Sequence, residues 1–142
     1  MEPLDLSTAP PRSPRAELAS IVFLPRSIDK LRAALPGGQL GEYNIEGFTT
    51  MMFEQLGIAI ADVSAIVASA ASEDDVAAYV TKHARPGGAD AWNAFALHRV
   101  IFNGDRAAAE EEIPWLRAHP EIVLALDMLA EDDRRSFAAA PH

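Results

Sequence analysis

Cysteine is absent from this chain of 142 residues. Its absence excludes disulfide bonds, metal sites built on thiolates and cysteine nucleophiles. No HExxH pair is present, and the four histidines lack the spacing of metal ligands. These are His83, His98, His119 and His142. We therefore expect a protein with no metal site and no other cofactor.

Two further catalytic signatures are missing. The chain has no GxSxG segment, which argues against a serine hydrolase of that class. Its one glycine pair near a basic segment, Gly37-Gly38, follows a predicted helix, whereas a phosphate-binding loop follows a strand and opens a helix. Composition and motifs therefore decide neither whether the protein is an enzyme nor which reaction it would catalyse.

Long apolar runs are also missing. The stretch 63–71 is the longest low-charge run after the first predicted helix, and it is too short to cross a bilayer. The first fifteen residues carry acids and prolines where a signal peptide would have a basic start and an apolar core. We expect a cytoplasmic protein that does not bind membranes.

Charge is plentiful but unevenly distributed. The formal net charge is −9, which argues against nucleic-acid binding as the main activity. Residues 10–35 nevertheless carry five basic residues against two acidic ones, which leaves a surplus of twelve negative charges elsewhere. A small basic patch on an acidic protein favours a small anionic molecule as the partner.

The hydrophobic pattern predicts an all-α protein. Apolar residues recur at helical spacing, and alternating runs typical of strands are nearly absent. We expect a single domain, a compact bundle of short helices with an extended N-terminal arm: arm 1–12, helical core 13–86, C-terminal helices 89–130 and a frayed tail 131–142. The expected helices are 14–24, 26–35, 51–56, 60–71, 73–84, 91–102, one capped by Asp105 and one at 120–130. Ser72 before three acidic residues is a strong helix start.

The segment from Pro11 to Tyr43 holds the candidate site. Arg26 and Lys30 lie four residues apart, so they share one helix face, and Asp29 lies beside them. Arg26 follows Pro25 near the helix start, where free backbone N–H groups favour an anion. Glu42 and Tyr43 follow in a loop and supply a carboxylate and a phenol. We take Glu42, Tyr43 and Asp29 as candidate catalytic residues, and Arg12, Arg15, Arg26 and Lys30 as candidate ligand-binding residues.

For residues on a helix surface, a structural interpretation is favoured over the functional one by about two to one. In it, Arg26, Asp29 and Lys30 form ion pairs on a solvated face. Glu42 then anchors Arg15 or ties down the N-terminal arm. Tyr43 would be an amphipathic residue at the edge of the core.

Five segments, in their order along the chain, resemble a bacterial family of unknown function, domain family number 5069. They are PRSPR (11–15), LPRSIDKLRAAL (24–35), GEY (41–43), FEQLGI (53–58) and the pair Trp92-Asn93. The resemblance covers about residues 4–93. It departs after GEY, where the family has a cysteine-proline-leucine-aspartate stretch and this chain has Ile45-Glu46-Gly47-Phe48. The resemblance implies a helical fold and assigns no chemistry.

Two hypotheses of function follow. The first is a small-molecule site for an acidic ligand, extending to an acid–base enzyme of lyase, isomerase or hydratase type that needs no cofactor. The alternative is a non-catalytic helical protein that binds other proteins or forms a homodimer through its C-terminal apolar residues Trp115, Ile122 and Leu126. Nucleic-acid binding through Arg12, Arg15 and Arg26 ranks last.

Overall fold

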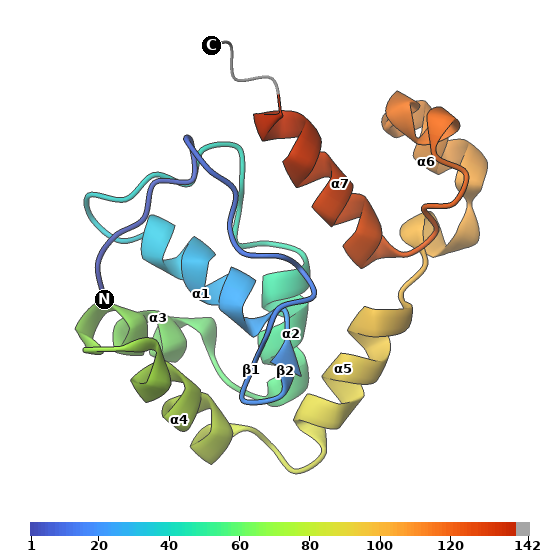
Figure 1. The fold of residues 1–142 in the computed structure, drawn as a ribbon. Helices are drawn as coiled ribbons and strands as arrows, with labels where there is room; N and C mark the ends of the chain where they lie inside the picture. Colours follow the sequence, from blue (N-terminus) through green and yellow to red (C-terminus); the bar gives the residue numbers. More distant parts are fainter. Residues whose placement is uncertain (139–142) are drawn as a thin grey trace.

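A computed structural model describes residues 1–138, which form an assembly of short helices (Figure 1). The α-helices are α1 (Leu24–Ala33), α2 (Phe48–Leu56), α3 (Ile60–Ser69), α4 (Glu73–His83), α5 (Gly88–His98), α6 (Arg106–Glu112) and α7 (Ala125–Phe137), with 3₁₀ turns η1 (Ile101–Gly104) and η2 (Pro114–Ala118). This confirms the expected all-α class. Within 1–138, no one helix has the length and apolar character to cross a membrane, although α2 and α3 together, bent by 100°, pass on those two criteria.

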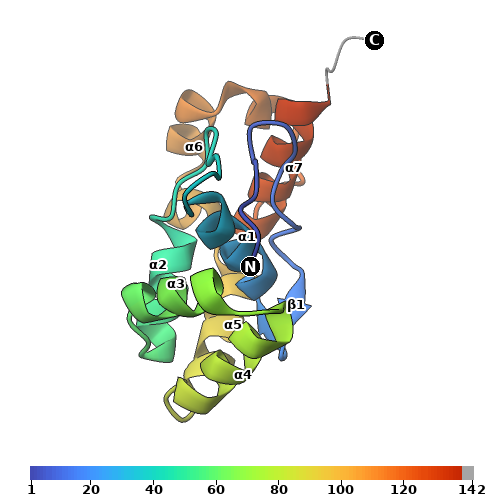
Figure 2. The same ribbon diagram turned by 90° about the vertical axis from the view of Figure 1, so that its left-hand side faces the viewer.

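Helix α1 lies in the middle of the molecule. Two views at right angles place α4 toward one end and α6 with α7 toward the opposite end (Figures 1 and 2). Eleven consecutive residues, 21–31, are buried, including charged ones. A helix enclosed on all sides must bury its polar side chains as well as its apolar ones, and buried charges require partners. This position of α1 creates the conditions for the site described below.

The segment before α1 is a two-stranded hairpin, so the predicted helix at 14–24 is wrong. Strands β1 (Glu17–Leu18) and β2 (Ile21–Val22) pair antiparallel. The two residues of the turn, Ala19 and Ser20, have φ of 52° and 61°. Left-handed backbone at both positions is the geometry of a tight hairpin turn, which usually carries asparagine and glycine. Neither residue is present, so the turn gave no sequence signal.

The pair Trp92-Asn93 on α5 holds this hairpin in place. Trp92 is buried, and its indole Nε1 donates a hydrogen bond to the Val22 carbonyl at 2.8 Å. The Asn93 side chain accepts from the Val22 N–H at 2.9 Å and donates to the Ser20 carbonyl at 2.7 Å. One asparagine therefore completes the backbone hydrogen bonding that so short a sheet leaves unmade.

Helix ends in the middle of the chain largely follow the prediction. Helices α3 and α4 begin as expected and end within two residues of the predicted ends. Ser72 and Asp75 form the expected capping box, and the Asp105 side chain accepts from the Ala108 N–H. Gly57 ends α2 in a left-handed conformation, φ 74°, that glycine adopts without strain. Local capping chemistry decided these boundaries.

The C-terminal helix corrects two predictions. It spans α7, not 120–130, and the expected frayed tail is helical from Glu131 to Phe137. The prediction of fraying rested on polar composition, but Asp133 is buried and bound to Arg26 of α1. A tertiary ion pair thus orders a segment with few apolar residues. The remainder of the predicted tail, from 139 onward, lies outside the described residues.

Aromatic side chains link the hairpin, α2 and α5 at the centre of the main core. The rings of Phe23, Phe48 and Trp92 meet edge to face, with centroids 5.5 to 6.3 Å apart. Such contacts add about 0.5–1.5 kcal/mol each beyond the area that they bury. Phe23 itself has φ of 75° at the start of α1, an unfavourable conformation that this packing must hold.

The N-terminal arm lies against α1 and the loop that follows it. The Leu6 N–H donates to the Gln39 carbonyl at 2.7 Å, and the Gln39 N–H donates to the Leu4 carbonyl at 2.9 Å. Gly41 passes so close that a Cβ there would stand 2.9 Å from the Leu6 carbonyl oxygen. The arm is therefore an ordered wall beside α1.

Replacing Asn93 by alanine should lower the free energy of unfolding by about 1–3 kcal/mol, because the buried Val22 N–H loses its acceptor. Chemical denaturation of Asn93→Ala measures the loss. Asn44→Ala is the matched control, since Asn44 is exposed and forms no hydrogen bond with any residue from 1 to 138. Equal stability of the two variants would show that Asn93 does not hold the hairpin.

Candidate functional site

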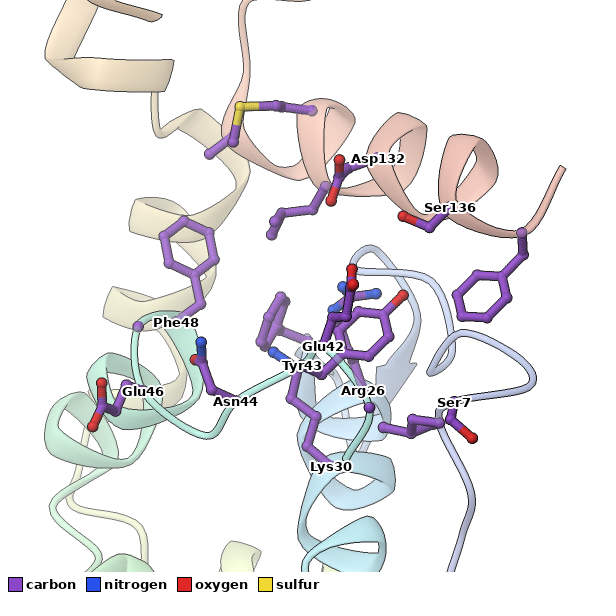
Figure 3. Close-up of a pocket in the computed structure, with 18 residues that line it drawn as sticks. Ser7, Arg26, Lys30, Glu42, Tyr43, Asn44, Glu46, Phe48, Asp132 and Ser136 are labelled. Atoms are coloured by element: carbon purple, nitrogen blue, oxygen red, sulfur yellow. The ribbon is translucent and has the colours of Figure 1, made fainter. Parts of the chain in front are cut away.

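A cavity of about 610 Å³ opens between α1, α7, the N-terminal arm and the loop before α2 (Figure 3). Ser7 comes from the arm, Arg26 and Lys30 from α1, Glu42 and Tyr43 from the loop, and Asp132 and Ser136 from α7. Phe23 and Phe48 of the aromatic cluster also line it. A volume of this size accommodates a small metabolite. Four of the predicted site residues therefore share one cavity: Arg26, Lys30, Glu42 and Tyr43.

Arg26 is the most deeply buried charged residue of the site, at 1% exposure. Its guanidinium donates to both carboxylate oxygens of Asp133, from Nη1 at 2.6 Å and from Nη2 at 3.2 Å. Nη1 also donates to the Arg12 carbonyl at 3.2 Å. The bidentate ion pair neutralises Arg26 and joins α1 to α7, and the hydrogen bond to the Arg12 carbonyl joins α1 to the arm. Arg26 is thus a structural cation whose charge is already balanced.

Tyr43 completes the arrangement around Asp133. Its hydroxyl donates to Asp133 Oδ1 at 2.7 Å, and its ring lies 5.5 Å from the Arg26 guanidinium carbon. Burial raises the pKa of Tyr43 well above its usual range, and the hydrogen bond to the Asp133 carboxylate raises it further. Tyr43 therefore stays protonated and serves first to hold Asp133.

Lys30 differs from every other predicted cation. It is 7% exposed and lines the cavity, and its ammonium forms no hydrogen bond or ion pair with any described residue. Its ammonium lies 5.5 Å from the centre of the Phe23 ring. Burial lowers the pKa of Lys30 to about 8, with the nearby Arg26 charge adding to the effect and Asp133 opposing it. The cavity thus contains a desolvated amine with no anionic partner in residues 1–138.

Two carboxyl groups lie in the wall opposite Lys30. Glu42 points from the loop toward α7, where Asp132 lies (Figure 3). Burial raises the pKa of Asp132, and the negative charges of Asp133 and Glu42 raise it further. Asp132 is therefore a carboxyl group that holds a proton more readily than usual. The cavity has an amine on one side and a carboxyl group with a raised pKa on another.

The other three predicted residues lie outside this cavity. Asp29 accepts from the Arg12 N–H at 2.8 Å, from Arg12 Nε at 3.1 Å and from Nη2 at 3.0 Å. Arg12 also contacts Glu73 of α4. These opposing charges, together with hydrogen bonds, place the pKa of Arg12 above its usual range. The Arg12–Asp29 pair fastens the arm to α1.

Arg15 pairs with Asp127 on the surface at 3.0 Å, and both side chains are more than 40% exposed. The structural interpretation in which Glu42 anchors Arg15 is therefore wrong. The same interpretation also expected ion pairs to fasten the arm. An ion pair does so, but its acceptor is Asp29 and not Glu42. An exposed pair of this kind contributes little to stability.

Sequence reasoning missed the contribution of α7. Asp132 and Asp133 lie about 90 residues from the loop that they face, in a segment with no apolar pattern that distinguishes it from a tail. No local signal was available for either residue. The one usable hint was chemical: a buried arginine requires an acidic partner, and the nearest acid on its own helix, Asp29, is held by Arg12.

The alternative hypothesis named three C-terminal residues as an interaction surface. Leu126 is fully buried in the main core. Ile122 and Trp115 pack against a second, smaller core formed by residues of η1, α6, η2 and the start of α7. Leu126 is therefore not available to a partner, whereas Ile122 and Trp115 are partly exposed, and the interaction hypothesis stays a prediction.

Among residues 1–138, no cluster of histidine, aspartate and glutamate side chains is arranged to hold a metal ion. Glu46, part of the stretch in which the sequence departs from the resemblance described above, also lines the cavity.

Comparison with known protein families identifies the chain. Its residues 8–135 match the model of a family described as a domain of unknown function, DUF5069, and the chain belongs to that family. The match extends well past residue 93, where the sequence resemblance ended, so α6 and most of α7 belong to the family domain and are not an added cap. A search of curated proteins found no match to the chain.

Asp133→Asn should lower the free energy of unfolding by about 3 kcal/mol or more, because it leaves the Arg26 charge buried without a counter-ion. Asp132→Asn is the matched control, one residue away on the same helix and outside the ion pair, and should change stability by less than about 0.5 kcal/mol. Urea denaturation of both variants tests this. If both variants were equally stable, the Arg26–Asp133 pair would not support the fold.

The lowered pKa of Lys30 should make stability rise with pH. Between about 8 and the unfolded value of about 10.4, the unfolded chain binds more protons at this residue than the folded chain. The unfolding free energy of wild type relative to Lys30→Met should therefore increase from pH 7.5 to 9.5, by at most about 1.4 kcal/mol per pH unit. A difference independent of pH would contradict the unpaired state of Lys30.

Proposed function

We propose that the cavity between α1 and α7 binds a small anionic molecule, with the Lys30 ammonium as its counter-ion. The observation that carries the proposal is the combination at Lys30: a nearly buried cation, on the wall of a cavity, with no anionic partner among residues 1–138. An unpaired buried charge is costly, by several kcal/mol. A ligand carboxylate or phosphate would offset that cost.

The acidic residues of the cavity do not oppose this proposal. Asp133 is balanced by Arg26. Glu42, Glu46 and Asp132 are exposed to solvent, where their charge is screened, and partial burial raises the pKa of Asp132. Lys30, by contrast, is desolvated, so its attraction for an anion acts in a low dielectric. Position therefore favours binding of the ligand's acidic group at the Lys30 end.

The proposal extends to acid–base chemistry on the bound anion. Asp132 supplies a carboxyl group whose pKa is raised by partial burial and by neighbouring negative charge, Glu42 a second carboxyl group beside it, and Lys30 an amine with a pKa of about 8. Tyr43 acts as a positioning residue through Asp133. A lyase, isomerase or hydratase reaction on an acidic substrate needs groups of these kinds and no cofactor.

A thermal-shift screen of small carboxylates and phosphates tests the binding site. A ligand at about 100 times its dissociation constant should add about 2.7 kcal/mol of stability, which is several degrees for a domain of this size. We expect hits with wild type and with Lys82→Met, and none with Lys30→Met. Lys82 is an exposed lysine on α4 and serves as the matched control.

The unliganded Lys30→Met variant should be at least as stable as wild type at pH 7, because methionine removes a charge that is unfavourably buried. A marked loss of stability would show that Lys30 has a structural partner. Anion hits that persist unchanged in Lys30→Met would place the binding site elsewhere.

A further inference from the structure

We propose that Lys30 is a carbonyl-reactive amine, which forms an imine with a small aldehyde or ketone that also carries a carboxylate. The ligand class is thus an oxo acid. This inference rests on the proposed anion site and names its substrate class.

The first argument is the position of the amine. Only an uncharged amine attacks a carbonyl carbon, and a lysine gains nucleophilicity when it is desolvated or placed beside another cation. Lys30 meets both conditions: it is nearly buried against the Phe23 ring, and Arg26 lies one turn earlier on the same helix. It also has no carboxylate partner within residues 1–138 to hold its proton. These features make it an amine available for reaction.

The surroundings of Lys30 also differ from those of the other amines in the chain. The sequence contains one other lysine, Lys82, which is exposed on α4. The Met1 amino group donates to the Val67 and Ala70 carbonyls at 2.8 and 2.9 Å. Neither of them lines the cavity, so Lys30 is set apart by its surroundings and not by its residue type.

The third argument is the chemistry of the surrounding wall. The Nζ lone pair attacks the carbonyl carbon, the carbonyl π electrons move to oxygen, and a proton passes from nitrogen to that oxygen. Protonation of the resulting hydroxyl lets it leave as water while nitrogen forms the C=N bond. The net change is amine plus carbonyl to imine plus water, with no oxidant or reductant. Asp132 and Glu42 line the same cavity and are the groups that can supply and accept these protons.

The carboxylate of the ligand follows from charge. A protonated imine keeps the positive charge of Lys30, and the Arg26 charge is already balanced by Asp133. A carboxylate next to the reacting carbonyl would therefore be the counter-ion that the site lacks, both before and after the reaction.

The pH dependence separates the two kinds of binding. The charged and titratable groups around Lys30 are Arg26 on α1, Glu42, Tyr43 and Glu46 on the loop, and Asp132 and Asp133 on α7. Since the pKa of Lys30 is about 8, raising the pH through 8 should weaken simple anion binding and speed imine formation. A single ammonium that only binds anions would give the first trend without the second.

Reductive trapping tests the inference. The full chain is incubated at pH 7 with glyoxylate, then reduced with borohydride, and peptide mass mapping locates the added carboxymethyl group. We expect the label on Lys30 to exceed that on Lys82 by about tenfold or more, because a pKa near 8 gives a much larger uncharged fraction at pH 7 than that of an ordinary lysine. Lys82→Met should keep the label and Lys30→Met should lose it.

Two matched probes separate the two proposals. Glycolate has the carboxylate but no carbonyl, and it should compete with the trapping and raise the melting temperature. Acetaldehyde has the carbonyl but no carboxylate, and it should label Lys30 at least tenfold less. Equal labelling of Lys30 and Lys82 by glyoxylate would overturn the proposal that Lys30 forms an imine. If glycolate still raised the melting temperature in that case, the proposed anion site would be retained. Equal labelling of Lys30 by acetaldehyde and glyoxylate would overturn the oxo-acid class.

Discussion

The ion pair between Arg26 and Asp133 is the constraint on which the site depends. It joins the buried central helix to the C-terminal helix through two residues that lie 107 positions apart in the chain. Tyr43 binds the same carboxylate, and the Arg12 carbonyl binds the same guanidinium, so the loop and the arm are tied to the pair as well. Four segments that are distant in sequence therefore meet around one buried pair. Together with the aromatic cluster, they form the walls of the cavity.

Arg26 has a counter-ion in Asp133, whereas Lys30 has none among the described residues. The two cations lie one turn apart on α1, and the acids near them are used unequally: Asp133 binds Arg26, and Asp29 binds Arg12. Lys30 lines the cavity, and its ammonium lies 5.5 Å from the centre of the Phe23 ring. An amine kept in such surroundings destabilises the free protein. The proposed ligand gives a physical reason to keep it there, because a bound anion or an imine would relieve the same unfavourable burial.

The features that could be predicted from the sequence are those decided by residues close together in the chain. Capping residues such as Ser72 and Asp105 act within one turn of a helix, so the starts of α4 and α6 could be predicted. The hairpin could not, because Ala19 and Ser20 adopt left-handed backbone that neither residue type suggests and that Trp92 and Asn93 support from α5. The same distinction holds in the site. Arg26 and Lys30 share a helix face by spacing alone, whereas Asp132 and Asp133 reach them only through tertiary packing.

The central claim is that Lys30 carries a desolvated amine without an anionic partner. Because the chain has only two lysines, ¹³C labelling at lysine Cε gives two side-chain signals, and Lys30→Met assigns the one that belongs to Lys30. A pH titration followed by this signal measures the pKa directly. The account predicts a midpoint near 8 that rises when glycolate is added. A midpoint at the ordinary lysine value of about 10.4, unchanged by glycolate, would contradict it.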